Sequence, residues 1–402
     1  MTANSIAISE RMKRINPSAT VALTDKAKEL KSKGRNIVTM SAGEPDFDTP
    51  APIVRAAKKA LDDGDTHYVS SRGIKELREA IAEKLLKKNG IEGLTAEDIL
   101  VTPGAKAGLM FACLALLDKG DQCICPEPAW VSYRECVSFA GADYVPIETR
   151  GDDSFSLLPE DLEKALTPKS KLLILNSPNN PTGRVWSRKR LEAIAELVER
   201  HDLFVLADEI YEDLTYDGVV HSSFASIDGM EDRCLTLNGF SKAYAMTGWR
   251  LGYIAGPRSI IDQMLKIQQH STTCAASFSQ RAALTALSEG ESHVEGMLEI
   301  FAKRRSLLLD GLSHIPGIKA EAPEGTFYLF LNVKELKLSS FELAEALLEE
   351  VDLAITPGSA FGSAGEGYLR ISFAASEDDI SECCRRLDEF VRGRFPRDSR
   401  SR

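Results

Sequence analysis

The segment from Asn238 to Arg250 holds the residues with the clearest potential for chemistry. Lys242 directly follows Ser241, and Arg250 lies eight positions further along the chain. An amine is a useful nucleophile at neutral pH only where burial or a neighbouring cation lowers its pKa. The pattern favours a lysine that forms a Schiff base with an aldehyde cofactor whose phosphate is bound nearby. Taken alone, a Ser-Lys pair more often marks the start of a helix with a solvated lysine. The other motifs of the chain must therefore decide between a cofactor-binding lysine and a solvated one.

The elements that must position these residues alternate between strand and helix, the pattern of a doubly wound α/β sheet. Strands are predicted at residues 99–102, 122–125, 143–146, 171–175, 204–207, 234–237 and 251–255. Helices are predicted between them at 105–117, 129–140, 159–165, 187–201 and 257–270.

The pattern changes after about residue 292, where a smaller α+β domain is predicted. It contains helices at 294–312, 340–350 and 376–392 and strands at 326–331, 353–356 and 367–371. A helix is also predicted at 21–32, within a segment that carries few turn signals toward the sheet. We therefore expect an N-terminal arm (1–46) that packs with the small domain, a large domain (47–291) and a small C-terminal domain (292–402).

Ligands of open α/β sheets collect beyond the carboxyl ends of the strands, and unusual residues follow several predicted strands. The turn at 103–108 is rich in small residues and begins a helix, whose free N–H groups and dipole suit a phosphate. Trp130 follows the next strand and could stack on a planar ring, although a core tryptophan is the simpler interpretation. The run NSPNNPTG at 176–183 forms a tight turn that presents Asn180 as an amide donor.

A carboxylate ends the predicted strand at 204–207. Asp208 emerges from this apolar run, and Tyr211 follows three residues later. A charge at the end of a buried strand must be paired, because an unpaired one costs several kcal/mol. A protonated pyridine nitrogen is a fitting partner, and an ion pair with Arg250 or Lys242 is the alternative without a ligand.

Together these motifs resemble the class I/II aminotransferases of fold type I, the pyridoxal-phosphate family that includes aspartate aminotransferase. Matching segments run from PSAT at 17–20 and SAGEPDF at 41–47 to YLRISF at 368–373. The resemblance implies an α/β fold with a mixed, mostly parallel sheet in the large domain and a smaller α+β domain. It also implies pyridoxal 5′-phosphate as the cofactor.

The resemblance assigns roles to the residues around this cofactor. Lys242 would hold it as a Schiff base and move the proton at the substrate's α-carbon, and Asp208 would keep the ring nitrogen protonated. Tyr211 and Asn180 would hydrogen-bond the ring's phenolic oxygen, while Trp130 would stack on the ring. The phosphate would be bound by the Ala105 and Lys106 backbone, by Ser241 and Arg250, and by Tyr68 from a second subunit. A homodimer with shared active sites is therefore implied.

Substrate recognition follows from three further positions. Arg370 would take the α-carboxylate as a bidentate fork, and Gly43 would let the backbone approach that carboxylate. Lys106 stands where bacterial aspartate aminotransferases carry a lysine for the distal carboxylate, which favours aspartate and glutamate. Several positions expected at the mouth depart from the family pattern, among them Asn16, Arg72, Glu127, Ala129 and Cys274. Arg72 could add an anion contact or face solvent.

Two reactions fit the same residues. One is transamination between an amino acid and a 2-oxo acid by a ping-pong route. The other is a biosynthetic elimination, replacement or cyclisation on the same cofactor. Both need Lys242, Asp208 and Arg370, so the sequence leaves the choice between them open.

Composition excludes other classes of function. The 402 residues carry a net charge of -11, which argues against nucleic acid as a partner. The longest apolar stretch (107–117) is too short to cross a bilayer, and the N-terminus lacks a secretory pattern. Eight scattered cysteines indicate reduced thiols, and the six histidines lack the spacing of a metal site. A soluble, cytoplasmic enzyme without a metal is predicted.

Overall fold

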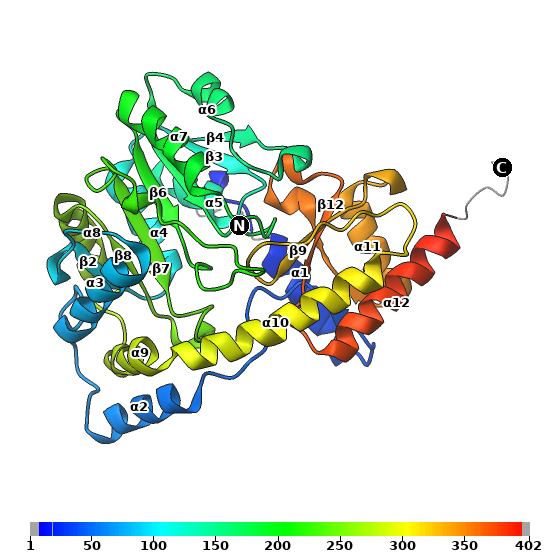
Figure 1. The fold of residues 1–402 in the computed structure, drawn as a ribbon, viewed down its shortest axis with the longest axis horizontal. Coiled ribbons are helices and arrows are strands. Elements are labelled where there is room, and N and C mark those ends of the chain that lie inside the picture. The colour runs from blue at the N-terminus through cyan, green and yellow to red at the C-terminus, as the bar shows by residue number, and fades with distance from the viewer. Residues whose placement is uncertain (1–7, 18, 396–402) are drawn as a thin grey trace, which may run out of the picture.

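A seven-stranded sheet organises the larger part of the chain (Figure 1). The structure is a computed structural model, and it describes residues 8–17 and 19–395. The strand order is β2-β8-β7-β6-β5-β3-β4. The strands are β2 (Ile99–Thr102), β3 (Gln122–Glu127), β4 (Asp143–Glu148), β5 (Ser170–Asn176), β6 (Phe204–Asp208), β7 (Cys234–Gly239) and β8 (Gly252–Ala255). Only β8 runs against its neighbours β2 and β7, while the other pairs are parallel.

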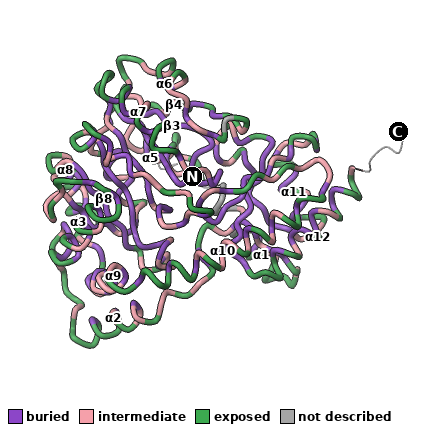
Figure 2. The backbone as a smooth tube through the Cα atoms, viewed as in Figure 1, coloured by how far each residue is buried: buried purple, intermediate pink, exposed green. Residues whose placement is uncertain are grey.

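Helices cover both faces of this sheet because successive strand side chains point to opposite sides. Leu206 of β6 packs in a core with α4 (Ala105–Leu116), α5 (Ser132–Ala140) and α8 (Arg258–Ser271). Its neighbours Val205 and Ala207 pack in a second core with α6 (Pro159–Ala165) and α7 (Arg188–Arg200). Figure 2 shows the buried backbone concentrated along these strands. The predicted α/β fold with a mixed, mostly parallel sheet is confirmed.

Three helices lie at the β2 end of the sheet where none was predicted. They are α2 (Ala51–Asp62), α3 (Lys75–Asn89) and α9 (Ser277–Glu289), which form a core with β2 and β8. Alanine and serine supply many of the buried positions of α9, so its apolar stripe is weak in the sequence. In α3, Leu77, Ile81 and Leu85 recur at helical spacing and are fully buried, a signal that the sequence carried.

The C-terminal part is a small α+β unit. Its antiparallel sheet has the order β11-β12-β9, formed by β11 (Thr356–Pro357), β12 (Tyr368–Ser372) and β9 (Tyr328–Asn332). Helices α11 (Ser340–Val351) and α12 (Glu377–Arg394) pack beside it, and the 22-residue α10 (Glu291–Leu312) runs toward it from α9 (Figure 1). The strand predicted at 353–356 is instead two short strands in different sheets, β10 (Leu353–Ala354) and β11.

The N-terminal segment contacts this small unit. Strand β1 (Val38–Thr39) pairs in parallel with β10, and Arg35 Nε donates to Asp352 Oδ1 at 2.6 Å. Helix α1 (Ala19–Ser32) places Ala27 in a core with Leu348. The chain therefore joins the small unit first, and residues 41–44 then line the cavity described below.

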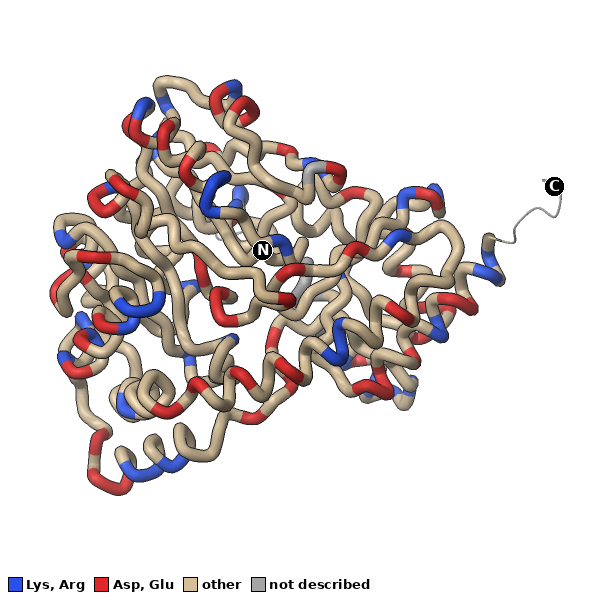
Figure 3. Tube along the Cα trace, viewed as in Figure 1, with Lys and Arg blue, Asp and Glu red and all other residues tan. Residues whose placement is uncertain are grey.

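Charged residues of both signs are interspersed along the chain in Figure 3. No helix in the described part is long and apolar enough to cross a bilayer. The eight cysteines are all free thiols, and seven of them are buried.

Candidate active site

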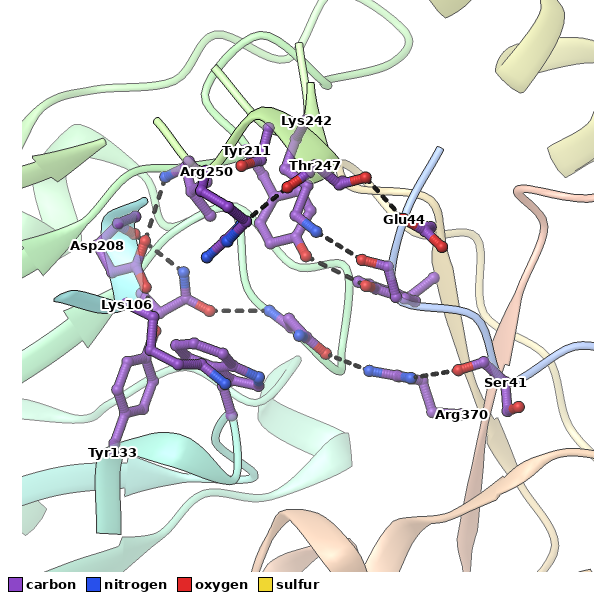
Figure 4. Close-up of a pocket in the computed structure, with 18 of the residues that line it drawn as sticks. Ser41, Glu44, Lys106, Tyr133, Asp208, Tyr211, Lys242, Thr247, Arg250 and Arg370 are labelled. Atoms are coloured by element: carbon purple, nitrogen blue, oxygen red, sulfur yellow. Dashed lines mark hydrogen bonds between the residues drawn. The ribbon is translucent and has the colours of Figure 1, made fainter. Parts of the chain in front are cut away.

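A cavity of about 450 Å³ lies at the carboxyl edge of the large sheet, closed on one side by the small unit and by residues 41–44 (Figure 4). The predicted site residues that line it are Gly43, Ala105, Lys106, Trp130, Asn180, Asp208, Tyr211, Ser241, Lys242, Arg250 and Arg370. Tyr68 is not among its lining residues. Residues from distant parts of the sequence thus meet in one site.

Lys242 follows β7 by three residues, and its amine points into the cavity (Figure 4). Nζ donates to the Gly43 carbonyl at 2.5 Å. Burial lowers the pKa of the amine to about 8; the Glu44 carboxylate opposes this shift, and Arg370 and Arg250 add to it. A substantial fraction of the amine is therefore neutral near pH 8, as a nucleophile or base requires.

Asp208 ends β6 and is only 4% exposed. Tyr133 Oη donates to its Oδ2 at 2.6 Å. Burial raises the pKa of the carboxyl to about 6, and the Tyr133 bond is the main effect against this. In the described residues the Asp208 carboxylate has no ion pair with Lys242 or Arg250. The alternative of such an ion pair in place of a ligand, which the sequence left open, is therefore wrong. A buried carboxylate without a cation needs one from a ligand.

The start of α4 and Arg250 form a cradle for an anion. Gly104, which precedes the helix, has a φ of +83°, and a Cβ there would lie 2.5 Å from Arg250 Nη2. A side chain here would have to displace the Arg250 guanidinium and adopt a backbone conformation that favours glycine. Arg250 itself has a left-handed φ of 52°, and its Nη1 donates to the Thr247 carbonyl at 2.8 Å. Because β8 is antiparallel, Arg250, two residues before it, lies at the same sheet edge as the helix N-terminus.

Arg370 lies in β12 with its side chain against two aromatic rings. Its guanidinium carbon is 4.3 Å from the centre of the Tyr328 ring and 4.9 Å from that of Phe361. Nη1 donates to Asn180 Oδ1 and Nη2 to the Ser41 carbonyl, each at 3.0 Å. The residue is 3% exposed, and no acidic side chain of the described residues pairs with it. Burial lowers its pKa, but a guanidinium stays charged, so it can pair with an anionic ligand.

Polar groups near these charges leave donors for a ligand. The side-chain oxygen of Asn180 accepts from Arg370, so its NH₂ group is free to donate. The Tyr211 and Tyr328 hydroxyls lie 3.1 Å apart. A Cβ on Gly43 would lie 3.6 Å from Tyr328 Oη, an ordinary contact, so any need for glycine there must come from a bound substrate.

Lys106 lies in the first turn of α4, with Nζ 4.8 Å from the centre of the Trp130 ring. Burial lowers its pKa, and Arg250 adds to this effect. Within the described residues it has no ion-pair partner. It is therefore a second cation of the cavity that can accept a ligand anion.

With this geometry in place, the relatives are informative. The family described as "Aminotransferase class I and II" matches residues 35–387. An aspartate aminotransferase of Pyrococcus abyssi is 44% identical over 389 residues, 96% of this chain and 99% of the relative. An aromatic-amino-acid aminotransferase of Thermococcus litoralis is 42% identical with the same coverage. The solved aspartate aminotransferase of Thermus thermophilus with maleate has a TM-score of 0.92 at 42% identity, covering 96% of this chain and 100% of that one.

The chain belongs to the class I and II aminotransferases. It is a pyridoxal-phosphate-dependent transferase, as the resemblance implied. The relatives favour transamination over elimination, replacement or cyclisation, which settles the choice that the sequence left open.

The cavity of this aminotransferase fits the cofactor. It offers an amine of lowered pKa (Lys242), a buried acid for a ring nitrogen (Asp208), an aromatic face (Trp130) and a phosphate cradle at Gly104 with Arg250. These groups lie on separate elements and meet only in the fold.

Two tyrosines of the site were missed by the sequence analysis. Tyr133, on α5, bonds to Asp208 and packs edge-on against Trp130 at 5.5 Å. Tyr328, on β9, contacts both Tyr211 and Arg370. Tyr133 stands three residues after Trp130, about one helical turn away. That spacing in the sequence could have placed it beside Trp130 in the site. Tyr328 carried no comparable signal.

The residues expected at the mouth do not line this cavity. Arg72 is buried, with Nη1 donating to the Glu97 carbonyl at 2.6 Å and Nη2 paired with Asp262. It therefore neither faces solvent nor adds an anion contact, and both expectations were wrong. Glu127 accepts from Arg134 at 2.9 Å behind Trp130. Asn16, Ala129 and Cys274 line other hollows.

A buried acidic cluster lies behind the site. Glu209, Glu212 and His221 have ligand-type atoms within 4.8 Å of one another. Both oxygens of each carboxylate already have donors, which come from Ser223, Phe224, Lys84 and Asn89. The cluster is a network of ion pairs and hydrogen bonds.

We predict that Tyr133→Phe lowers kcat/KM by about 10- to 100-fold, since hydrogen bonds to charged groups are worth about 1.5–3 kcal/mol. Tyr133 holds down the pKa of Asp208, so its removal should move the acid limb of the pH–rate profile to higher pH. Tyr216→Phe is the matched control, because among the described residues that buried hydroxyl bonds only the Thr326 carbonyl. An unmoved acid limb in Tyr133→Phe would contradict the prediction.

Proposed function

We propose that this aminotransferase transfers the amino group of an acidic amino acid, aspartate or glutamate, to a 2-oxo acid. The observation that carries this proposal is the pair of unpaired cations, Arg370 and Lys106, on the wall of one cavity. A dicarboxylic substrate presents two carboxylates, one for each. The Thermus relative was solved with maleate, which also carries two carboxylates.

When bound, pyridoxal phosphate supplies an aldehyde for the substrate's amino group and a ring that withdraws electrons from its α-carbon. The chain's residues do the rest. Lys242 moves the proton at the α-carbon, because its lowered pKa lets it act as base and then as acid. Asp208, positioned by Tyr133, keeps the ring nitrogen protonated. Tyr211 and Asn180 donate hydrogen bonds to the ring's phenolic oxygen.

Binding groups orient the substrate and the cofactor around Lys242. Arg370, fixed between Tyr328 and Phe361, takes the α-carboxylate through its planar fork. The Ala105 and Lys106 backbone, Ser241 and Arg250 bind the phosphate at the start of α4. Trp130 stacks on the ring, and Gly43 admits the substrate carboxylate.

We also infer a homodimer in which Tyr68 reaches the phosphate of the partner subunit. Tyr68 is 86% exposed and borders a hollow lined by Cys274 and Phe278. An adjoining hollow of about 720 Å³ includes Leu61, Trp249 and Arg250, so it reaches the phosphate cradle. An exposed tyrosine beside an apolar hollow next to the cofactor site favours a second copy as the occupant.

The arm (1–46), large domain (47–291) and small domain (292–402) are our proposed division, with residues 1–7, 18 and 396–402 outside the described part. Contacts of β1 with β10 and of Arg35 with Asp352 support placing the arm with the small domain. Eight unpaired cysteines are consistent with a cytoplasmic location.

We expect Lys242→Ala to abolish turnover, since in this proposal Lys242 supplies the amine that moves the proton at the α-carbon. Absorbance of the bound cofactor, followed while an amino acid is added without oxo acid, gives the measurement. Wild type should convert to the amine form of the cofactor and the variant should not, although it retains the phosphate cradle. Repeated turnover by the variant at the wild-type rate would refute the assignment.

Lys106→Ala should reduce kcat/KM for aspartate by about 10- to 100-fold, because a charged hydrogen bond is worth about 1.5–3 kcal/mol, and should leave neutral amino acids nearly unchanged. Lys28→Ala, which removes another lysine lining the cavity, is the comparison. Equal losses in the two variants would assign the effect to general positive potential instead of a specific contact.

Tyr68→Phe should weaken cofactor affinity by about 10- to 100-fold, because it removes a hydrogen bond to a charged phosphate, which is worth about 1.5–3 kcal/mol. The dimer should persist because the ring remains. Equilibrium dialysis of the cofactor measures the first effect and sedimentation the second. A wild-type monomer at working concentration, or an unchanged cofactor affinity, would contradict the shared site.

A further inference from the structure

Glu44 is a carboxylate on the wall of the cofactor cavity with no role in the scheme above. It lines the cavity together with Lys242 and Arg370. Its Oε2 accepts a hydrogen bond from Thr247 Oγ1 at 2.6 Å, and in the described part of the chain no lysine or arginine pairs with it. Figure 4 shows Glu44 and Thr247 joined beside Lys242. A carboxylate here would repel the carboxylates of the proposed substrate, so its presence calls for an explanation.

The surrounding contacts hold this carboxylate in place. Thr247 is itself fixed, because its carbonyl accepts from Arg250 Nη1 at 2.8 Å. Five residues beyond Glu44, Thr49 Oγ1 donates to the Ala245 carbonyl at 2.6 Å. Between them, Asp46 pairs with Arg304 at 2.7 Å. The segment is therefore anchored on both sides of the cavity edge, and the carboxylate has a defined position.

The chemistry near Glu44 requires an approaching cation. At neutral pH an amino acid carries an α-ammonium group beside its α-carboxylate, and a 2-oxo acid carries only the carboxylate. Arg370 takes the carboxylate, and the amino group must come to the side of Lys242, whose Nζ bonds the carbonyl of Gly43, the residue before Glu44. The Glu44 carboxylate raises the pKa of the Lys242 amine, so a cation at that place is attracted by it.

Other acids of the cavity are less suited to this task. Asp208 is buried and bonded to Tyr133 and to the Ile210 backbone. Asp25 lies exposed on α1. Glu44 alone is anchored next to the carbonyl that contacts the reactive amine.

We propose that Glu44 recognises the α-ammonium group of the incoming amino acid. Arg370 and Glu44 then form a pair of opposite charges that binds the α-carboxylate and the α-ammonium group of the amino acid. The inference rests on the proposed function, in which Arg370 binds the α-carboxylate. It predicts that Glu44 contributes to the amino-acid half-reaction and not to binding of the 2-oxo acid.

The test compares Glu44→Gln with wild type on two ligands that differ only in the ammonium group, 2-methylaspartate and 2-methylsuccinate. Calorimetric titration of the cofactor-free protein measures binding without turnover. Because Glu44 lies at the exposed rim, we expect a modest effect, a loss of about 2- to 5-fold for 2-methylaspartate. Binding of 2-methylsuccinate should not weaken, since removing a negative charge cannot disfavour a dianion. Equal weakening of both ligands, or no change in either, would overturn the proposal.

Thr247→Val is the matched control, because it removes the hydroxyl that holds Glu44 but keeps the charge. It should weaken binding of 2-methylaspartate less than Glu44→Gln does, because the charge remains, whereas a selective loss equal to that of Glu44→Gln would assign the effect to the position of the segment and overturn the proposal. If wild type binds neither ligand, the acidic-substrate proposal fails. The same comparison with α-methylphenylalanine and 2-methyl-3-phenylpropanoate then tests Glu44 separately.

Discussion

Unpaired buried charge is the constraint on which the site depends. Arg370 and Asp208 are each almost fully buried, and neither is neutralised by an oppositely charged side chain of the described residues. Such groups are costly in an apolar interior unless hydrogen bonds or a ligand compensate. The chain supplies partial compensation through Tyr133 for the acid and through Asn180, Ser41 and two aromatic rings for the guanidinium. The remaining part of each interaction is open to a ligand of opposite charge, and binding of such a ligand would relieve a cost that folding has already incurred.

Topology brings these charges together. The parallel strands β5, β6 and β7 end at one edge, where Asn180, Asp208 and Lys242 follow them. The reversed strand β8 begins at that edge and so adds Arg250. Arg370 comes from the small unit, across the cavity. Each element is held by its own apolar core, which fixes the positions of these polar groups, and Arg370 and Asn180 are joined across the cavity by a hydrogen bond.

Much of this arrangement was readable in the sequence. All seven strands of the large sheet were located to within two residues. The central ones are short, buried apolar runs bounded by turn residues. Eleven predicted residues line the cavity, since each follows or precedes a strand end or carries a family motif. Helix α9 was missed because alanine and serine fill much of its buried face. Helices α2 and α3 carry buried apolar residues at helical spacing, so their signal was present in the sequence and was overlooked. Tyr328 was missed because its role depends on how the small unit docks, and Arg72 was misplaced because its partners, Glu97 and Asp262, lie far away in the chain.

The path of residues 35–49 has a mechanical consequence. Strand β1 of this stretch pairs with β10 of the small unit, and the Ser41 carbonyl accepts a hydrogen bond from Arg370. A few residues later, Glu44 and Thr49 form hydrogen bonds with Thr247 and Ala245 of the loop that follows Lys242. This stretch thus ties Arg370 to the rim above Lys242. Any movement of one lobe against the other must pull on it, so the separation between Arg370 and the loop around Lys242 is limited by a piece of backbone and not by either lobe alone.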